Sequence, residues 1–126
     1  MLTYIMIPDA PPPKSPYSHA VKCGDLLFVA GQTGHDPKTG ELAGETVTEH
    51  AEQAMKNLEA ILTASGIGFA QVVKTTCFLV NIEDMAAFNE VYGRYFKEKP
   101  ARSCFAVKEL PRKTLCEVEL IATLKK

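Results

Sequence analysis

Residues 114–124 read Thr-Leu-Cys-Glu-Val-Glu-Leu-Ile-Ala-Thr-Leu and predict a strand with two unlike faces. In a strand, successive side chains point to opposite sides of the sheet. One face is wholly apolar, and we expect helices to cover it; it holds Cys116, Val118, Leu120, Ala122 and Leu124. The other face mixes apolar side chains with two carboxylates, Glu117 and Glu119. Such a mixed face fits a subunit interface that contains a polar cleft.

A second charged group stands at the start of the preceding apolar strand, which is predicted over 103–107. It is Arg102, in the segment Lys99-Pro100-Ala101-Arg102-Ser103-Cys104. A charge among apolar residues is costly unless it has a partner, so Arg102 and Glu117 together indicate a site. In a simple hairpin of the last two strands, their Cβ atoms would stand about 5 Å apart. Two alternatives stay open: another strand lies between them, or they meet across a subunit boundary.

The rest of the sequence predicts a single α+β domain over residues 1–126 with the order ββαβαββ. Strands over 19–23 and 26–30 flank the turn Gly24-Asp25. Thr46-Val47-Thr48-Glu49 fits a capping box, and helical periodicity follows it up to Gly66. The β-branched run 72–80 suits a central strand covered on both faces, and a second helix is predicted over 84–97. Residues 4–7 are a further short β-prone segment.

Composition excludes several classes of protein. The net charge is -1 with mixed signs along the chain, which argues against a nucleic-acid partner. No apolar run is long enough for a signal peptide or membrane span, so we expect a soluble, cytoplasmic protein. The four cysteines and three histidines show no metal-ligand spacing, so no metal or other cofactor is expected. The cysteines are expected to be reduced core thiols, and His19, His35 and His50 to lie in loops or on the surface.

Several motifs, taken in order, resemble those of the RidA (YjgF/UK-type) reactive-intermediate deaminase family. The resemblance covers nearly the whole chain, and the Pro-Ala-Arg-Ser segment with the later glutamate is its most specific part. The motifs are Tyr17-Ser18 after a proline, Ala30-Gly31-Gln32 ahead of Asp36-Pro37-Lys38-Thr39-Gly40, Val73-Lys74-Thr75-Thr76, Phe88-Asn89-Glu90-Val91-Tyr92, Pro100-Ala101-Arg102-Ser103-Cys104 and Glu117-Val118-Glu119.

The resemblance implies a chorismate-mutase-like fold, with a mixed sheet and two helices on one of its faces. It also implies a homotrimer whose sheets form a central barrel, with three clefts between subunits. Proteins of this family hydrolyse short 2-imino acids, such as 2-iminopropanoate and 2-iminobutanoate, to 2-oxo acids and ammonia. On the family pattern, Tyr17, Asn89 and Cys104 line the same cleft as Arg102 and Glu117.

The two charged residues suit this chemistry. A guanidinium binds a carboxylate bidentately and stays charged at any working pH, so Arg102 is expected to hold the substrate carboxylate. A carboxylate within reach of a water molecule can orient it and accept its proton, which is the role expected of Glu117. No covalent step is required, because a protonated imine is already electrophilic.

Two positions depart from the family pattern: Ser15 replaces a common glycine and Ala30 replaces a common serine. The loss of the hydroxyl at Ala30 removes a possible hydrogen bond to substrate or water. Two other functions are alternatives to deamination. One is a non-catalytic ligand-binding or regulatory module for 2-oxo acids. The other is an endoribonuclease or translation inhibitor, against which the net charge of -1 speaks.

Overall fold

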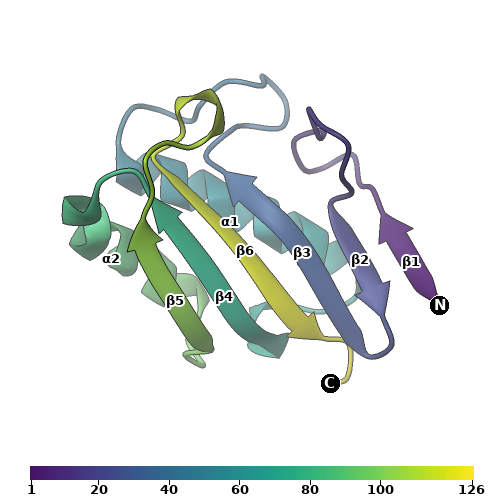
Figure 1. The fold of residues 1–126 in the computed structure, drawn as a ribbon. Helices are drawn as coiled ribbons and strands as arrows, with labels where there is room; N and C mark the ends of the chain where they lie inside the picture. Colours follow the sequence, from purple (N-terminus) through teal and green to yellow (C-terminus); the bar gives the residue numbers. More distant parts are fainter.

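A computed structural model describes residues 1–126 and shows a six-stranded mixed sheet with two helices on one face (Figure 1). The strands are β1 (Leu2–Ile5), β2 (Ala20–Cys23), β3 (Leu26–Thr33), β4 (Val72–Leu79), β5 (Ala101–Ala106) and β6 (Cys116–Thr123). The helices are α1 (Val47–Ala64) and α2 (Met85–Tyr95). The order ββαβαββ is confirmed from β2 onward, and β1 adds an edge strand in front of it.

The sheet order is β1-β2-β3-β6-β4-β5, so the last strand lies inside the sheet. β6 pairs antiparallel with both β3 and β4, whereas β4 and β5 are parallel. β4 therefore lies between β5 and β6. The simple hairpin of the last two strands is not formed, and the alternative with an inserted strand is the observed one.

Helix α1 begins and ends where local chemistry satisfies its free backbone groups. At the start of α1, Thr46 accepts a hydrogen bond from the Glu49 amide, and the Glu49 carboxylate accepts one from the Thr46 amide. This is the predicted capping box. After Ser65, Gly66 takes a φ of 78°, a left-handed conformation in which glycine carries no steric penalty. A short 3₁₀ turn, Ile82–Asp84, leads into α2.

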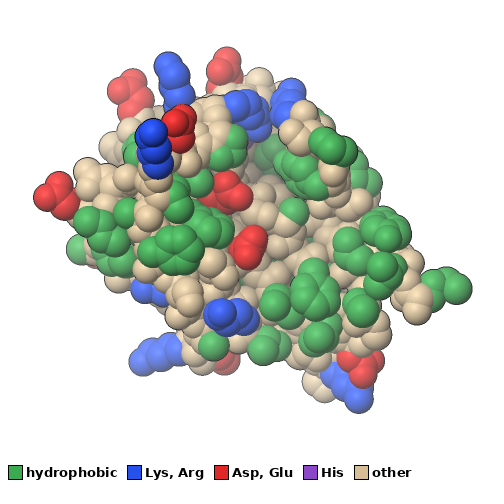
Figure 2. Space-filling view, in the orientation of Figure 1, with side chains coloured by type: hydrophobic (Ala, Val, Ile, Leu, Met, Phe, Trp, Pro, Cys, Tyr) green, Lys and Arg blue, Asp and Glu red, His purple; other side chains and the backbone are tan.

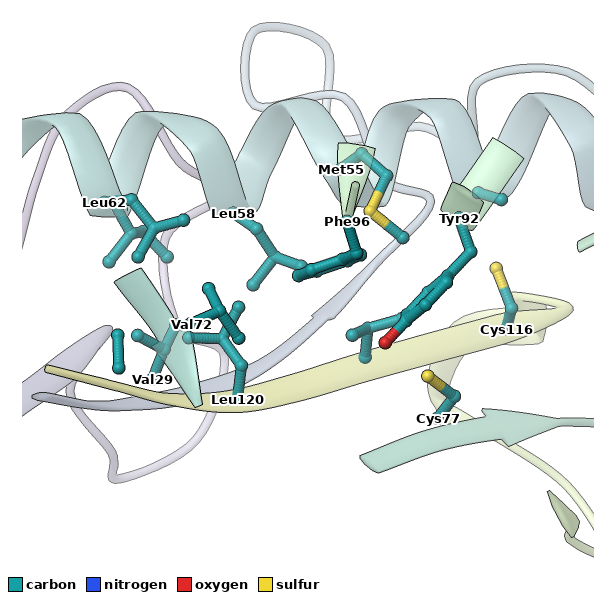
Figure 3. Packing of buried hydrophobic residues seen from close by; sticks show 14 of the residues in the cluster. Val29, Met55, Leu58, Leu62, Val72, Cys77, Tyr92, Phe96, Cys116 and Leu120 are labelled. Carbon is teal, nitrogen blue, oxygen red and sulfur yellow. The ribbon is translucent and has the colours of Figure 1, made fainter. Parts of the chain in front are cut away.

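The core fills the space between the helices and one face of the sheet (Figure 3). Burial confirms the predicted apolar face of β6, since Cys116, Val118, Leu120 and Ala122 are all buried. Opposite them, the helices contribute Met55, Leu58, Ile61, Leu62, Phe88, Val91 and Tyr92. Burying a side chain of this size contributes about 1.5–3 kcal/mol, so this layer stabilises the fold strongly.

The other face of the sheet carries no helix. The register places Tyr4, Val21, Phe28 and Ile121 side by side across β1, β2, β3 and β6. Tyr4 is 65% exposed and Phe28 42%, which is high for apolar residues in a sheet. Figure 2 shows hydrophobic side chains on this face around a hollow that contains acidic groups. The predicted cover on both faces of β4 is therefore not provided within one chain, and Lys74, Thr76 and Phe78 on the helix-free face are only partly buried.

Neither helix is long and apolar enough to cross a membrane.

Candidate functional site

Arg102 lies on edge strand β5 and faces the helix layer. Its Cα is in register with Thr75, whose side chain is buried under α2. The Arg102 guanidinium donates a hydrogen bond of 2.8 Å to the Asn89 side-chain carbonyl. Its central carbon also lies 4.6 Å from the ring centroid of Tyr92, a cation–π distance. Two contacts from α2 thus hold the guanidinium and leave most of its donors free.

Tyr92 links this arginine to the core. Its hydroxyl forms a 2.8 Å hydrogen bond with the buried Thr75 hydroxyl, and its ring stacks on Phe96 with centroids 4.4 Å apart. Figure 3 shows the ring reaching from α2 towards the sheet. Burial raises the pKa of Tyr92, so the residue stays neutral and serves as a rigid platform for Arg102.

Cys104 lies two residues further along β5 and shares the helix-side face with Arg102, as expected. Its thiol contacts the Met85 sulfur at 3.5 Å. Burial raises the pKa of the Cys104 thiol, and the nearby Arg102 only partly offsets this. A thiol that resists ionisation is a poor nucleophile, which agrees with a lining role for Cys104.

Glu117 lies on the opposite face of the sheet. It stands on β6 between Thr33 of β3 and Phe78 of β4. Its side chain lines a cavity of about 280 Å³ whose wall also includes Tyr17, Ala30 and Gly31. Burial, and secondarily the charge of Glu119, raises the pKa of the Glu117 carboxyl. No ion pair or hydrogen bond within the chain compensates this carboxylate.

Gly31 leaves room for the Glu117 side chain. A Cβ atom at this position would overlap the Glu117 carboxylate. The backbone of β3 and this carboxylate therefore pack directly against each other, which only glycine permits. The motif Ala30-Gly31-Gln32 includes this glycine, but the sequence alone does not show that the Glu117 side chain requires it.

The structure divides the five expected site residues into two groups on opposite faces of one sheet. Tyr17 and Glu117 line one cavity. Arg102, Asn89 and Cys104 lie together beside α2. Arg102 and Glu117 form no ion pair within the chain, so a structural salt bridge between neighbouring strands does not explain them. Sequence reasoning took Tyr92 only as a core residue and did not single out Thr75.

The expectation that the histidines lie in loops or on the surface holds for His19 and His35, which lie in loops, and is wrong for His50, which lies in α1; none of the three is on the surface. His19, His35 and His50 are 1%, 3% and 2% exposed. His19 and His50 accept hydrogen bonds from backbone amides distant in sequence, which a sequence pattern does not show, whereas His35 bonds to the nearby Thr33 hydroxyl. Among the cysteines, Cys77 and Cys116 are buried as expected, but Cys23 is exposed. All four are unpaired, and no group of three or more acidic, histidine or cysteine side chains is placed to hold a metal ion.

These features define a single-domain α+β protein whose expected site residues are split between the two faces of its sheet. Residues 7–124 match the family described as Endoribonuclease L-PSP, and the chain belongs to this family, which includes the RidA/YjgF proteins. A RutC family protein of Pyrococcus horikoshii is 44% identical over 97% of this chain and 98% of its own length. The human 2-iminobutanoate/2-iminopropanoate deaminase is 43% identical over 90% of this chain and 83% of its own.

The fold is shared as well. The solved structure of RidA from the Antarctic bacterium Psychrobacter sp. superposes with a TM-score of 0.92 at 36% identity, covering 96% of this chain and 98% of that one. The family resemblance stated from the motifs is therefore confirmed, and so is the α+β architecture.

Proposed function

We propose that this protein hydrolyses short-chain 2-imino acids, such as 2-iminopropanoate and 2-iminobutanoate, to 2-oxo acids and ammonia. The observation that carries the proposal is the uncompensated Glu117 carboxylate in its cavity. A carboxylate with a raised pKa is a stronger base than an ordinary one and is suited to take a proton from water. The 43% identical human deaminase supports the same reaction.

In this mechanism Arg102 binds the carboxylate of the imino acid. Asn89 and Tyr92 hold the guanidinium in place, so its orientation is set before the substrate arrives. Glu117 orients a water molecule and accepts its proton as the oxygen attacks the carbon of the protonated C=N bond. Glu117 then returns this proton to the nitrogen of the tetrahedral intermediate, the C–N bond breaks as ammonia leaves, and the hydroxyl group gives up its proton to Glu117 as the C=O bond of the 2-oxo acid forms. Tyr17, Asn89 and Cys104 line the substrate cleft.

The opposed faces of Arg102 and Glu117 support a site shared between subunits. We infer a homotrimer in which the exposed sheet face of one copy, with Tyr4, Phe28 and Ile121, is covered by another copy. An apolar surface of this kind commonly marks an interface. The cleft would combine Glu117 and Tyr17 of one copy with Arg102 of its neighbour. Since all four cysteines are unpaired, we also place the protein in the reducing cytoplasm.

A coupled assay tests the reaction. A threonine dehydratase generates 2-iminobutanoate, and ammonia release is followed with and without this protein. We expect acceleration by the wild type, and a loss of about 100-fold or more in kcat/KM for Arg102→Ala, since two charge-assisted hydrogen bonds to the carboxylate disappear. Arg94→Ala is the matched control, because Arg94 forms an exposed ion pair with Glu52 on the outer side of the helices. Equal rates with and without the wild-type protein would reject the proposal.

The family description favours ribonuclease action as a second candidate. The net charge of -1 and the acidic hollow of the open sheet face oppose RNA binding (Figure 2). RNA cleavage that copurifies with the protein and disappears in Arg102→Ala would favour the second candidate. Binding of 2-oxobutanoate without any acceleration of imine hydrolysis would instead favour a ligand-binding or regulatory module.

A further inference from the structure

The Glu117 cavity contains two cationic side chains that the proposed mechanism does not use. Lys14 comes from the segment before β2, and Arg112 comes from the loop between β5 and β6. Both side chains are exposed and neither forms an ion pair. Arg112 and the adjacent Lys113 have φ values of 50° and 65°, a left-handed conformation that costs non-glycine residues about 1 kcal/mol or more each. The loop adopts this strained conformation where it meets the cavity.

Buried hydrogen bonds hold the loop that carries Arg112. The Leu115 amide donates to His50 Nδ1 at 3.1 Å. Since Nδ1 accepts this bond, the proton of a neutral ring lies on Nε2, which donates to the Gly44 carbonyl at 2.9 Å. The Thr114 hydroxyl accepts from the Gly34 amide at 3.1 Å and donates to the Cys116 carbonyl at 2.9 Å. The end of the loop is therefore fixed on the α1 side of the fold.

The segment that carries Lys14 is held in the same way from the other side. The Ile7 amide donates to His19 Nδ1 at 2.9 Å, and His19 Nε2 donates to the Pro11 carbonyl at 2.8 Å. His19 is only 1% exposed, so this connection is shielded from water. Each of the two segments is thus held by a buried histidine, which limits the movement of the backbone that carries Lys14 and Arg112.

The cations do not neutralise Glu117. A close cation would lower the pKa of a carboxyl, yet the pKa of Glu117 is raised, and neither Arg112 nor Lys14 forms an ion pair with it. Arg112 and Lys14 are therefore available for another anion in the same cavity. In the proposed reaction the carboxylate next to the C=N bond binds to Arg102 of the neighbouring copy. An anion that binds to Arg112 and Lys14 must then lie elsewhere on the substrate.

We propose that Arg112 and Lys14 are specificity-determining residues that bind the side-chain carboxylate of dicarboxylic 2-imino acids, such as 2-iminosuccinate and 2-iminoglutarate. This inference rests on the proposed function and extends its substrate class. The hydrolysis proceeds by the same steps as for the monocarboxylic imines: water adds to the protonated imine, and ammonia leaves to give the 2-oxo diacid. The reaction that supplies such a substrate would be an oxidation of an acidic amino acid at its amino-bearing carbon.

The test compares Arg112→Gln and Lys14→Gln with the matched control Lys113→Gln. Lys113 is the next residue, has the same left-handed backbone and carries the same charge, but it lies outside the Glu117 cavity. Two readouts are taken: kcat/KM for 2-iminoglutarate relative to 2-iminopropanoate, and the Kd of 2-oxoglutarate relative to 2-oxobutanoate by calorimetry. For Arg112→Gln we expect both preferences for the diacid to fall about tenfold, as befits one charge-assisted hydrogen bond. We expect a smaller fall for Lys14→Gln and none for Lys113→Gln.

The two readouts separate the inference from the function on which it rests. If the wild type hydrolyses imines but Arg112→Gln and Lys113→Gln keep the same diacid preference, the inference is wrong and the proposed function stands. If no imine is hydrolysed but Arg112→Gln selectively weakens 2-oxoglutarate binding, the diacid site stands and the deaminase proposal fails. Equal binding of both 2-oxo acids by the wild type would overturn the inference.

Discussion

Mixing two inactive variants should restore activity, because no single chain brings Arg102 and Glu117 to the same side of the sheet. Arg102→Ala retains a native Glu117, and Glu117→Gln retains a native Arg102. β4 separates the two residues, whose side chains lie on opposite faces. A site that needs both must therefore take one residue from each of two copies.

The expected recovery of activity follows from the fraction of clefts that contain both native residues. In a cyclic assembly, each cleft takes Arg102 from one copy and Glu117 from the next. In a randomly mixed 1:1 population, each of these two positions is native in half of the cases. About one quarter of the clefts then contain both native residues, so the mixture should reach about one quarter of the wild-type rate. This fraction does not depend on the number of copies in the ring.

The assay uses the two variants with tags of different mass, mixed by co-refolding. Native mass spectrometry establishes that mixed assemblies have formed, and ammonia release from 2-iminobutanoate gives the rate. The control replaces Glu117→Gln with the double variant Arg102→Ala/Glu117→Gln, which leaves no cleft with both native residues. Mixed assemblies that are no more active than their parents would refute the shared cleft.

Further predictions concern Glu117, Arg102 and the residues around them. Folding raises the pKa of Glu117, so the ionised carboxylate lowers the stability of the folded protein at pH values above the usual range of a glutamate. Glu117→Gln should therefore raise the Tm at about pH 7. It should not raise the Tm at an acidic pH where the carboxyl is protonated in both the folded and the unfolded protein. In the wild type, kcat/KM should fall as the pH drops through this raised pKa. Gly31→Ala should displace the Glu117 side chain and reduce kcat/KM about tenfold or more while the protein stays folded. Gly93→Ala is the contrasting substitution, because a Cβ atom at this position in α2 meets open space. It should raise the free energy of unfolding in urea by up to about 1 kcal/mol. Thr75→Val leaves the Tyr92 hydroxyl unpaired and should lower the free energy of unfolding by about 1–3 kcal/mol. The double variant Thr75→Val/Tyr92→Phe should recover part of this loss, because it has no unpaired hydroxyl. A double variant no more stable than Thr75→Val would contradict the role of this hydrogen bond.

Local patterns predicted much of the fold. The capping box at Thr46 and the helical periodicity after it depend on residues close in sequence, and α1 begins at Val47 as expected. The two faces of β6 follow from strict alternation and match its burial. The turn at Gly24-Asp25 likewise joins two paired strands. In each case the physical cause lies within a few residues of the element itself.

These local patterns did not predict contacts between residues distant in the sequence. The register of β5 depends on β4, which is remote in sequence, and the hairpin alternative failed for that reason. The buried histidines are another case. His50 bonds to the amide of Leu115, 65 residues away, and no spacing in the sequence indicates such a partner. The left-handed backbone of Arg112 is also invisible in the sequence, because glycine is absent there.

The sequence by itself singled out the two residues proposed to carry the chemistry, since Arg102 and Glu117 stand out as charges in apolar strands. It also determined the elements that carry them and the family to which the chain belongs. Only the tertiary structure decided that the two charges lie on opposite faces, because the insertion of β4 sets which strands are neighbours. The same arrangement exposes an apolar sheet face and keeps Arg102 and Glu117 apart within one chain, and a second copy can both cover the face and bring the two residues to one cleft.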